Sequence, residues 1–319
     1  MKKISFCIPC YRSAKTIIPV IEEIKNIMTT KLDEFEYEVI TVVDGSPDNV
    51  FEVLKTYAIN NKFVKVINLS RNFSQANARM ATIKYATGDY LVCLDDDGQC
   101  PIPHLWELVD PLFHGKDVSI ANYPQKKQSL FKNFGSYVNR KMIHILMDVP
   151  KNFKMSNFYA MKKFVRSQIL EYKNPYPYLT GLILQVTNNI AYVDMEERER
   201  MEGNTGYTFS KLLALWLNGY TAFSVKPLRI SSLVGVICAI IGFIFGIVTV
   251  VRKLVVPNIS IGWSSTVSIM LFIGGLIMLM LGMIGEYIGR IYISINNSPQ
   301  YVIKEKINFD SDENEKYDE

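Results

Sequence analysis

The stretch Asp89-Tyr-Leu-Val-Cys-Leu-Asp-Asp-Asp-Gly-Gln-Cys-Pro101 places three consecutive carboxylates after an apolar run and before a break in the chain. The run Tyr90–Leu94 predicts a short buried strand, and the Gly and Pro that follow predict a turn. Neighbouring carboxylates repel one another unless a cation is present, so Asp95–Asp97 indicate a divalent metal held against an anionic partner. Acidic clusters in loops are more often solvated turns, and the flanking sequence has to distinguish the two.

Strands and helices alternate on the N-terminal side of the triplet. This order predicts parallel βαβ units with right-handed crossovers, and hence an α/β fold with helices on both faces of a mostly parallel sheet. The predicted strands are Ile4–Ile8, Tyr37–Val43, Val64–Leu69 and Tyr90–Leu94, and the predicted helices are Lys15–Met28, Val50–Asn60 and Gln75–Ala86.

The alternation continues less regularly beyond the triplet. We expect helices over Pro103–Phe113 and Leu130–Met147, a strand over Asp117–Ala121, a loop over Asn174–Tyr178 and an edge strand over Ala191–Glu197.

Polar residues follow three of the predicted strands. Pro9–Tyr11, Asp44–Ser46 and Asp95–Asp97 each come directly after an apolar run. In open sheets of this type ligands bind beyond the carboxyl ends of the strands, so all three segments are expected on one rim.

Two apolar segments near the C-terminus, Leu228–Val251 and Ser264–Ile288, are each long enough to cross a bilayer. We interpret them as a two-helix membrane hairpin over 228–292; a pair of buried core helices is the alternative. Residues 252–263 between them are too short for a domain, so both flanks lie on one side. Basic residues are more frequent in the flanks than in this link, which predicts a cytoplasmic N-terminal region and an inner-membrane, multi-pass protein. No cleaved signal peptide is apparent.

Apolar residues at helical spacing precede the first span. The stripe indicates an interfacial amphipathic helix over 208–227, with an ordinary core helix as the alternative. Its members are Phe209, Leu212, Leu213, Trp216, Leu217, Tyr220 and Phe223.

The net charge of +4 conceals an acidic end with six carboxylates and one lysine in residues 309–319. The rest of the chain is therefore more basic than the whole, which suits a body resting on anionic membrane lipid. No dense Lys/Arg block appears, which argues against a nucleic-acid partner. We expect 293–319 to be a cytoplasmic tail whose acidic end is disordered. Cys7, Cys10, Cys93 and Cys100 are interpreted as reduced buried thiols rather than a zinc site.

The chain contains none of the common nucleotide-loop or hydrolase-elbow motifs, and its three histidines are scattered. Hard oxygen ligands therefore point to Mg²⁺ or Mn²⁺ bridging a diphosphate.

Seven motifs in order resemble the polyisoprenyl-phosphate glycosyltransferases of glycosyltransferase family 2, a group that includes dolichyl-phosphate mannose synthases and bacterial bactoprenol glucosyltransferases. They are Ile8-Pro-Cys-Tyr11, Val43-Asp-Gly-Ser46, Leu69-Ser-Arg-Asn-Phe73, Leu94-Asp-Asp-Asp-Gly-Gln99, Arg200-Met-Glu-Gly-Asn-Thr-Gly-Tyr207, Phe223-Ser-Val-Lys-Pro-Leu-Arg229 and Gly285-Glu-Tyr-Ile-Gly-Arg-Ile-Tyr292.

The resemblance implies a GT-A domain over 1–207 that transfers a sugar, with inversion, from a nucleotide-sugar donor to a polyprenyl phosphate such as undecaprenyl phosphate, for cell-surface glycans or lipids. Asp95 and Asp97 would hold the metal on the donor diphosphate. Asp96 is expected to support them.

The resemblance also assigns a nucleotide-sugar pocket and a lipid-phosphate site. Pro9, Tyr11, Asp44 and Gln99 would line the pocket with Asp96, although Tyr11 packing and Asp44 bracing a turn are the plain alternatives. Arg200 and Thr205 lie where the family binds the acceptor phosphate. Ser136 and Arg140, four apart on the predicted helix Leu130–Met147, would add to that site; a solvated surface charge is an equal alternative for Arg140.

Four positions depart from the family pattern: Val43, Ser13, Cys100 and Asn157. The first three leave the donor open, and UDP-hexose is preferred only by family association. Asn157 stands in place of a carboxylate often assigned as base. A phosphate monoester with a second pKa of about 6 is already largely anionic at neutral pH, so we expect Asn157 to position the sugar or acceptor in an active enzyme.

Two other functions compete with this one. A processive polysaccharide synthase shares the fold, but the chain has no Gln-x-x-Arg-Trp motif and only two predicted spans. A non-catalytic membrane scaffold with a GT-A fold is the other. The sequence leaves homo-oligomerisation open, since family members can assemble through their membrane regions.

Overall fold

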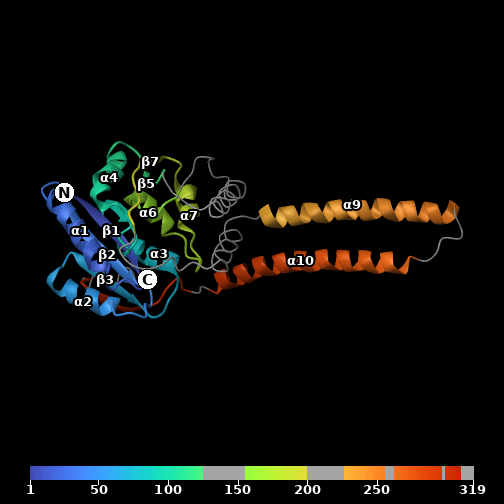
Figure 1. Ribbon diagram of the computed structural model, residues 1–319, viewed down its shortest axis with the longest axis horizontal. Helices are drawn as coiled ribbons and strands as arrows, with labels where there is room; N and C mark the ends of the chain where they lie inside the picture. Colours follow the sequence, from blue (N-terminus) through green and yellow to red (C-terminus); the bar gives the residue numbers. More distant parts are fainter. Residues whose placement is uncertain (125–154, 200–225, 256–261, 297–298, 310–319) are drawn as a thin grey trace. The chain divides into compact units, whose positions relative to one another are not determined.

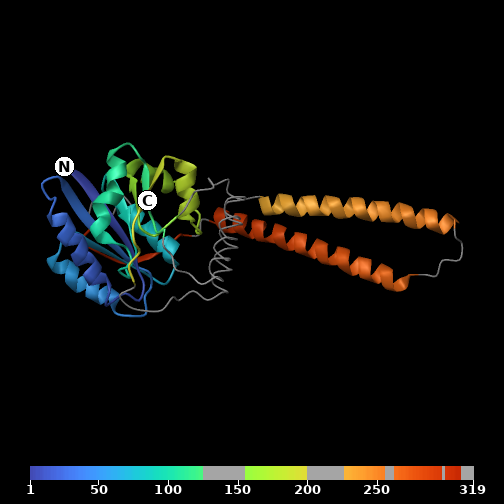
Figure 2. The ribbon, with the colours of Figure 1, turned by 45° about the horizontal axis from the view of Figure 1, so that its top comes forward.

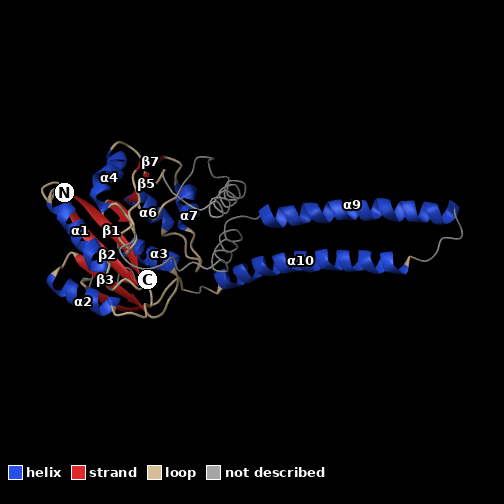
Figure 3. Cartoon of the chain, in the orientation of Figure 1, coloured by secondary structure: helices blue, strands red, loops and turns tan. Residues whose placement is uncertain are grey.

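The computed structural model describes residues 1–124, 155–199, 226–255, 262–296 and 299–309. These residues belong to two compact units, one built on a β-sheet and one made of two long helices. Figure 1 labels the elements, and Figure 3 separates helices from strands by colour.

A mixed eight-stranded sheet organises the first unit, in the order β7-β5-β6-β4-β1-β2-β3-β8. The four central strands β4, β1, β2 and β3 are mutually parallel, β7 is parallel to β5, and β6 and β8 run antiparallel to their neighbours. The strands are β1 (Lys2–Cys10), β2 (Phe35–Val43), β3 (Val64–Leu69), β4 (Tyr90–Cys93), β5 (Val118–Asn122), β6 (Tyr159–Lys162), β7 (Ile190–Asp194) and β8 (Ile303–Ile307).

Helices cover both faces of this sheet (Figure 2). The helical elements are α1 (Ile17–Thr29), α2 (Val50–Asn60), α3 (Gln75–Tyr85), the 3₁₀ turn η1 (Ile102–His104), α4 (Leu105–Phe113), α6 (Lys163–Ile169) and α7 (Leu179–Val186). Apolar residues of α1, α2 and α4 form one core with every second residue of β1. On the opposite face α3 packs against β1 and β2, and Arg166 of α6 donates to the carbonyls of Ile83 and Lys84 in α3. The predicted α/β fold with helices on both faces is confirmed.

The predicted elements agree with the described structure to within about two residues at most ends. The predicted helix Pro103–Phe113 divides into η1 and α4, and the predicted edge strand at Ala191–Glu197 is β7. The four cysteines of the sheet unit are buried and unpaired, as expected of reduced thiols. The predicted helices over Leu130–Met147 and 208–227 lie outside the described residues.

Strand β8 was not expected, since residues 293–319 were interpreted as a tail. It pairs with β3 at the sheet edge, and its Glu305 forms an ion pair with Lys55 of α2 at 2.7 Å. Just beyond it, the Asn308 amide donates to the carbonyls of Ala58 and Val64, both at 2.8 Å. The chain therefore returns to the same sheet after the two long helices.

The second unit contains α9 (Lys226–Val255) and α10 (Trp263–Ile295). Within α10, Phe272–Gly289 is long and apolar enough to span a membrane by length and composition, whereas the apolar part of α9 at Ser232–Ile244 is shorter. Both predicted apolar segments are thus helical, and α10 alone passes this length test among the described residues.

Candidate active site

The candidate site lies at the carboxyl ends of three neighbouring strands. Tyr11 directly follows β1, Asp44 directly follows β2, and Asp95 follows the adjacent β4 with one residue between them. The chain runs from β1 to β2 on one side and reaches β4 on the other, so β1 and β4 form a topological switch point, where open α/β sheets bind ligands. The predicted common rim is therefore present.

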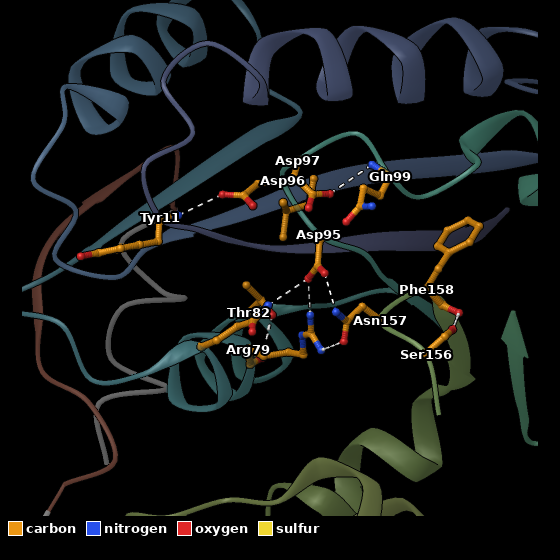
Figure 4. Close-up of polar contacts among 12 residues, drawn as sticks. Tyr11, Arg79, Thr82, Asp95, Asp96, Asp97, Gln99, Ser156, Asn157 and Phe158 are labelled. Atoms are coloured by element: carbon orange, nitrogen blue, oxygen red, sulfur yellow. Dashed lines mark hydrogen bonds and ion pairs between the residues drawn. The ribbon is translucent and has the colours of Figure 1, made fainter. Parts of the chain in front are cut away.

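The Asp95 carboxylate is held by three side chains (Figure 4). Its Oδ1 accepts hydrogen bonds from Arg79 Nη2 at 2.6 Å and Gln75 Nε2 at 3.0 Å. Its Oδ2 accepts from Asn157 Nδ2 at 2.5 Å, and Asn157 Oδ1 accepts from Arg79 Nη1 at 3.3 Å. Asp95, Arg79 and Asn157 thus form a closed polar triangle, supplied by the segment after β4, by α3 and by the segment before β6.

Asp96 turns away from this triangle. Its Oδ2 accepts the backbone N–H of Tyr11 at 2.9 Å, which ties the ends of β4 and β1 together. Burial raises the pKa of Asp96 to about 6, and the charges of Asp95 and Asp97 act in the same direction, while the Tyr11 amide opposes them. This geometry suits the supporting role expected from the sequence.

Asp97 lies in the turn that leaves the rim. Its Oδ1 accepts the backbone N–H of Gln99 at 3.1 Å across Gly98, whose φ is +78°. Gln99 in turn pairs with Arg198: the Arg198 N–H donates to the Gln99 carbonyl at 3.1 Å. A segment after β7 therefore fixes the turn that carries Asp97.

The other predicted donor residues are found on the rim in different settings. Pro9 is buried within β1, whereas the Tyr11 side chain is 44% exposed. Asp44 is buried, and its two oxygens accept the backbone N–H groups of Phe73 and Ser74 at 2.7 and 3.1 Å. Burial raises the pKa of Asp44, and these two hydrogen bonds oppose that rise. The described contacts of Asp44 are those of a residue that braces the loop before α3.

The four predicted acceptor residues, Ser136, Arg140, Arg200 and Thr205, lie outside the described residues. The structure therefore does not relate them to Asp95.

Arg79 and Gln75 are site residues that the sequence analysis did not identify. They lie four apart on α3, hence on one helix face, and α3 begins at the same rim as the carboxylates. The available signal was a charged residue within a helix whose other residues from Asn77 to Ile83 are buried. A buried arginine requires a partner, and the nearby carboxylates offer one.

The rim can be tested for its fit to a divalent cation. No group of three or more His, Cys, Asp or Glu side chains gathers as a metal site within the described ranges. Asp95 and Asp97 nevertheless supply hard carboxylate oxygens, and Mg²⁺ is commonly held by one or two carboxylates plus substrate phosphates and water. The donor chemistry fits Mg²⁺ or Mn²⁺ taken up together with a diphosphate.

Comparison with known proteins identifies the family of this chain. A model of glycosyl transferase family 2 matches residues 5–172, and a model of the GtrB C-terminal hairpin matches residues 226–291. The glycosyltransferase YkcC of Bacillus subtilis is 30% identical over 94% of this chain and 93% of its own length. The bactoprenol glucosyl transferase of Shigella phage SfII is 28% identical over 95% of this chain and 97% of its own.

Solved structures share the fold at low sequence identity. Mannosyl-3-phosphoglycerate synthase from Rubrobacter xylanophilus has a TM-score of 0.53 at 15% identity, covering 72% of this chain and 74% of its own. Glucosyl-3-phosphoglycerate synthase from Mycobacterium tuberculosis, in complex with Mn²⁺, UDP-glucose and phosphoglyceric acid, has a TM-score of 0.51 at 19% identity, covering 68% and 76%. The family model spans more than half of the chain and a 30%-identical relative covers nearly all of it, so the chain belongs to glycosyltransferase family 2.

Proposed function

We propose that this protein is an inverting hexosyltransferase that moves a sugar from a nucleotide-sugar donor to a polyprenyl phosphate in the membrane. One combination carries the proposal: acidic residues at the β1–β4 switch point of a family 2 domain, followed by a segment that matches the GtrB hairpin. Relatives named bactoprenol glucosyl transferase, which align over nearly the full chain, support the choice of acceptor.

The donor is a UDP-hexose, and its diphosphate binds with Mg²⁺ or Mn²⁺. A solved structure with the same fold is described with both Mn²⁺ and UDP-glucose, which supports this choice. Asp95 and Asp97 hold the cation, and Tyr11 with Gln99 borders the nucleotide. The cation supplies charge neutralisation for the departing nucleotide diphosphate.

The remaining chemistry is carried by side chains of the chain itself. A phosphate monoester is already largely anionic at neutral pH, so the acceptor requires orientation more than deprotonation. Asn157 lies beside Asp95 and orients the reacting groups through its amide. Arg200 and Thr205, with Ser136 and Arg140, bind the acceptor phosphate in this proposal, because arginine and hydroxyl donors suit a phosphate.

The two long helices anchor the protein as a two-pass hairpin in the cytoplasmic membrane. Strand β8 follows α10 in sequence and pairs with β3 in the sheet that precedes α9. Both ends of the hairpin thus connect to one folded unit, which requires an even number of crossings. The excess of Lys and Arg in the flanks supports a cytoplasmic position for that unit.

The proposal is tested by incubating membranes that contain the full chain with undecaprenyl phosphate, Mn²⁺ and a panel of labelled nucleotide sugars, and then identifying the extracted lipid. We expect one donor to yield a lipid phosphate carrying a single hexose. Replacing both Asp95 and Asp97 with Ala should lower the rate about 10²–10³-fold while membrane insertion is retained. A labelled polymer would identify a processive synthase instead, and no labelled lipid from any donor would favour a scaffold.

A further inference from the structure

Arg79 is a buried cation that faces the metal-binding carboxylate. The residue is 8% exposed, and its Nη2 lies 2.6 Å from Oδ1 of Asp95, whose side chain is 16% exposed. Its Nε is buried and has no acceptor among the described residues. The carboxylate of Asp95 is the ion-pair partner of this buried guanidinium among the described residues. The free energy of burying Arg79 therefore depends strongly on Asp95.

Asn157 bridges Arg79 and Asp95 and leaves Asp95 as the carboxylate that pairs with Arg79. It accepts from Arg79 through Oδ1 and donates to Asp95 through Nδ2, so it bridges the two charges without adding one (Figure 4). The family resemblance implies a carboxylate at this position, which would take a share of the guanidinium charge. With an amide there, Arg79 and Asp95 compensate each other.

A divalent cation bound to Asp95 alone would lie close to the guanidinium in a poorly solvated place. The two positive charges repel, and the ion must also compete for an oxygen that Arg79 and Gln75 already occupy. A nucleotide diphosphate reverses this balance, because its negative charges attract both the metal and the arginine.

We propose that Arg79 is a positioning residue that makes metal binding at Asp95 depend on the nucleotide diphosphate. In the donor-free protein it occupies Asp95 and keeps the affinity for a free divalent cation low. When the diphosphate arrives, the guanidinium turns to its oxygens and Asp95 becomes available to the metal. The inference rests on the proposed function, in which Asp95 holds the cation.

The test is the Mn²⁺ dissociation constant of the purified full chain, measured by calorimetry with and without UDP. The informative quantity is the dissociation constant for Mn²⁺ without UDP divided by that with UDP. This ratio reports the coupling between metal and nucleotide. In Arg79→Met, Mn²⁺ alone should bind at least about 10-fold more tightly, and the ratio should fall by a similar factor. Arg79→Lys retains the charge and should keep a ratio near that of the wild type.

Arg166→Met is the matched control. Arg166 is equally buried, at 8% exposed, but it binds backbone carbonyls of α3 instead of a carboxylate. This variant should lose stability without changing the ratio. If Arg79→Met does not fold, Arg79→Gln removes the charge while retaining donors for Asp95, and the same ratio is measured.

Each outcome bears on a separate claim. An unchanged ratio in the charge-removing Arg79 variants, or an equal fall in Arg166→Met, overturns the role of Arg79 and leaves the proposed function standing. Mn²⁺·UDP binding that persists unchanged when Asp95 and Asp97 are both Ala overturns the metal assignment itself.

Discussion

Three adjacent aspartates in this chain have three different surroundings. Asp95 is ion-paired with Arg79, Asp96 accepts the backbone N–H of Tyr11 just after β1, and Asp97 closes its own turn. Because successive residues at a strand end point in different directions, a run of identical side chains does not supply identical ligands. Contacts from distant segments distinguish Asp95 and Asp96, whereas the hydrogen bond of Asp97 lies within its own turn.

At the same scale, Asn157→Asp tests whether a missing base limits this enzyme. The new carboxylate would lie beside Asp95 and compete for Arg79, while the acceptor phosphate already carries its nucleophilic charge. We expect the turnover of the lipid phosphate to rise by less than about 10-fold, or to fall. The measurement is initial rate at saturating donor, with Asn157→Ala as the control for lost contacts. A rise of several orders of magnitude would show that the natural protein lacks a base it needs.

At the scale of elements, the loop that precedes α3 depends on a close approach at Gly45. A Cβ on Gly45 would lie 2.3 Å from both the Arg71 carbonyl carbon and the Asn72 nitrogen, and its φ is +55°. The same loop is braced by Asp44 and leads into the helix that carries Arg79. Rigid contact at this turn therefore sets where α3 begins.

Gly45→Ala should accordingly lower both stability and donor affinity. Left-handed backbone costs about 1–2 kcal/mol for alanine, and the clash with the loop backbone adds about 1–3 kcal/mol. Gly115→Ala is the control, because Gly115 also has a positive φ, +95°, but no atom within 4 Å of a new Cβ. Thermal unfolding and UDP titration of both variants provide the comparison, and equal effects of the two substitutions would contradict the role of the clash.

A buried glutamate links the central strands and makes the stability of the fold depend on pH. Burial alone would raise the pKa of Glu38, but hydrogen bonds from Ser5 and Thr87 and the charge of Lys3 lower it to about 2 from 4.5. The carboxylate of β2 thus connects β1 with the segment before β4. Its folded pKa lies below its unfolded pKa, so its stabilisation is present above about pH 4.5 and is lost as the pH falls towards 2.

This shift corresponds to about 3 kcal/mol at neutral pH. Glu38→Gln should therefore be much less stable than the wild type at pH 7, and the difference between the two proteins should narrow from about pH 4.5 downwards. Urea unfolding of both proteins across this range measures the difference. Parallel curves, with a gap that does not depend on pH, would contradict the linkage.

The elements that could be predicted from sequence are those whose signal is local. Strands β1, β2 and β4 contain continuous buried stretches that are largely apolar, β3 mixes buried apolar with partly buried polar residues, and turn residues mark their ends. Strand β6 is only Tyr159–Lys162, and β8 reads Ile-Lys-Glu-Lys-Ile, which resembles a solvated tail. The partner of β8 is β3, which is more than two hundred residues away in sequence, so no local pattern reveals the pairing. Arg79 was missed for the same reason, since its role depends on Asp95 and Asn157 in other segments.

For the whole molecule, the topology is constrained because one sheet contains strands that precede α9 in the sequence and a strand, β8, that follows α10. In the proposed two-pass topology, the link between α9 and α10 is expected on the side of the membrane opposite the sheet. The sheet unit and β8 must share the other side.

Labelling with a membrane-impermeant maleimide in intact cells tests this topology. In a Cys238→Ser background, Ser260→Cys should react, whereas Thr56→Cys, exposed on α2, should react only after the cells are permeabilised. The four cysteines of the sheet unit are buried and should give little background. Labelling of Thr56→Cys in intact cells, or protection of Ser260→Cys, would rule out the proposed orientation.

The position of β8 also imposes an order on biosynthesis. Until the ribosome has completed both long helices, β3 is an open edge strand with unpaired N–H and C=O groups, a ready template for pairing with another chain. The nascent domain is then exposed to aggregation until residues beyond α10 have been translated. The pairing of β8 with β3 is therefore a late folding step, since only a chain translated beyond both long helices can cover that edge.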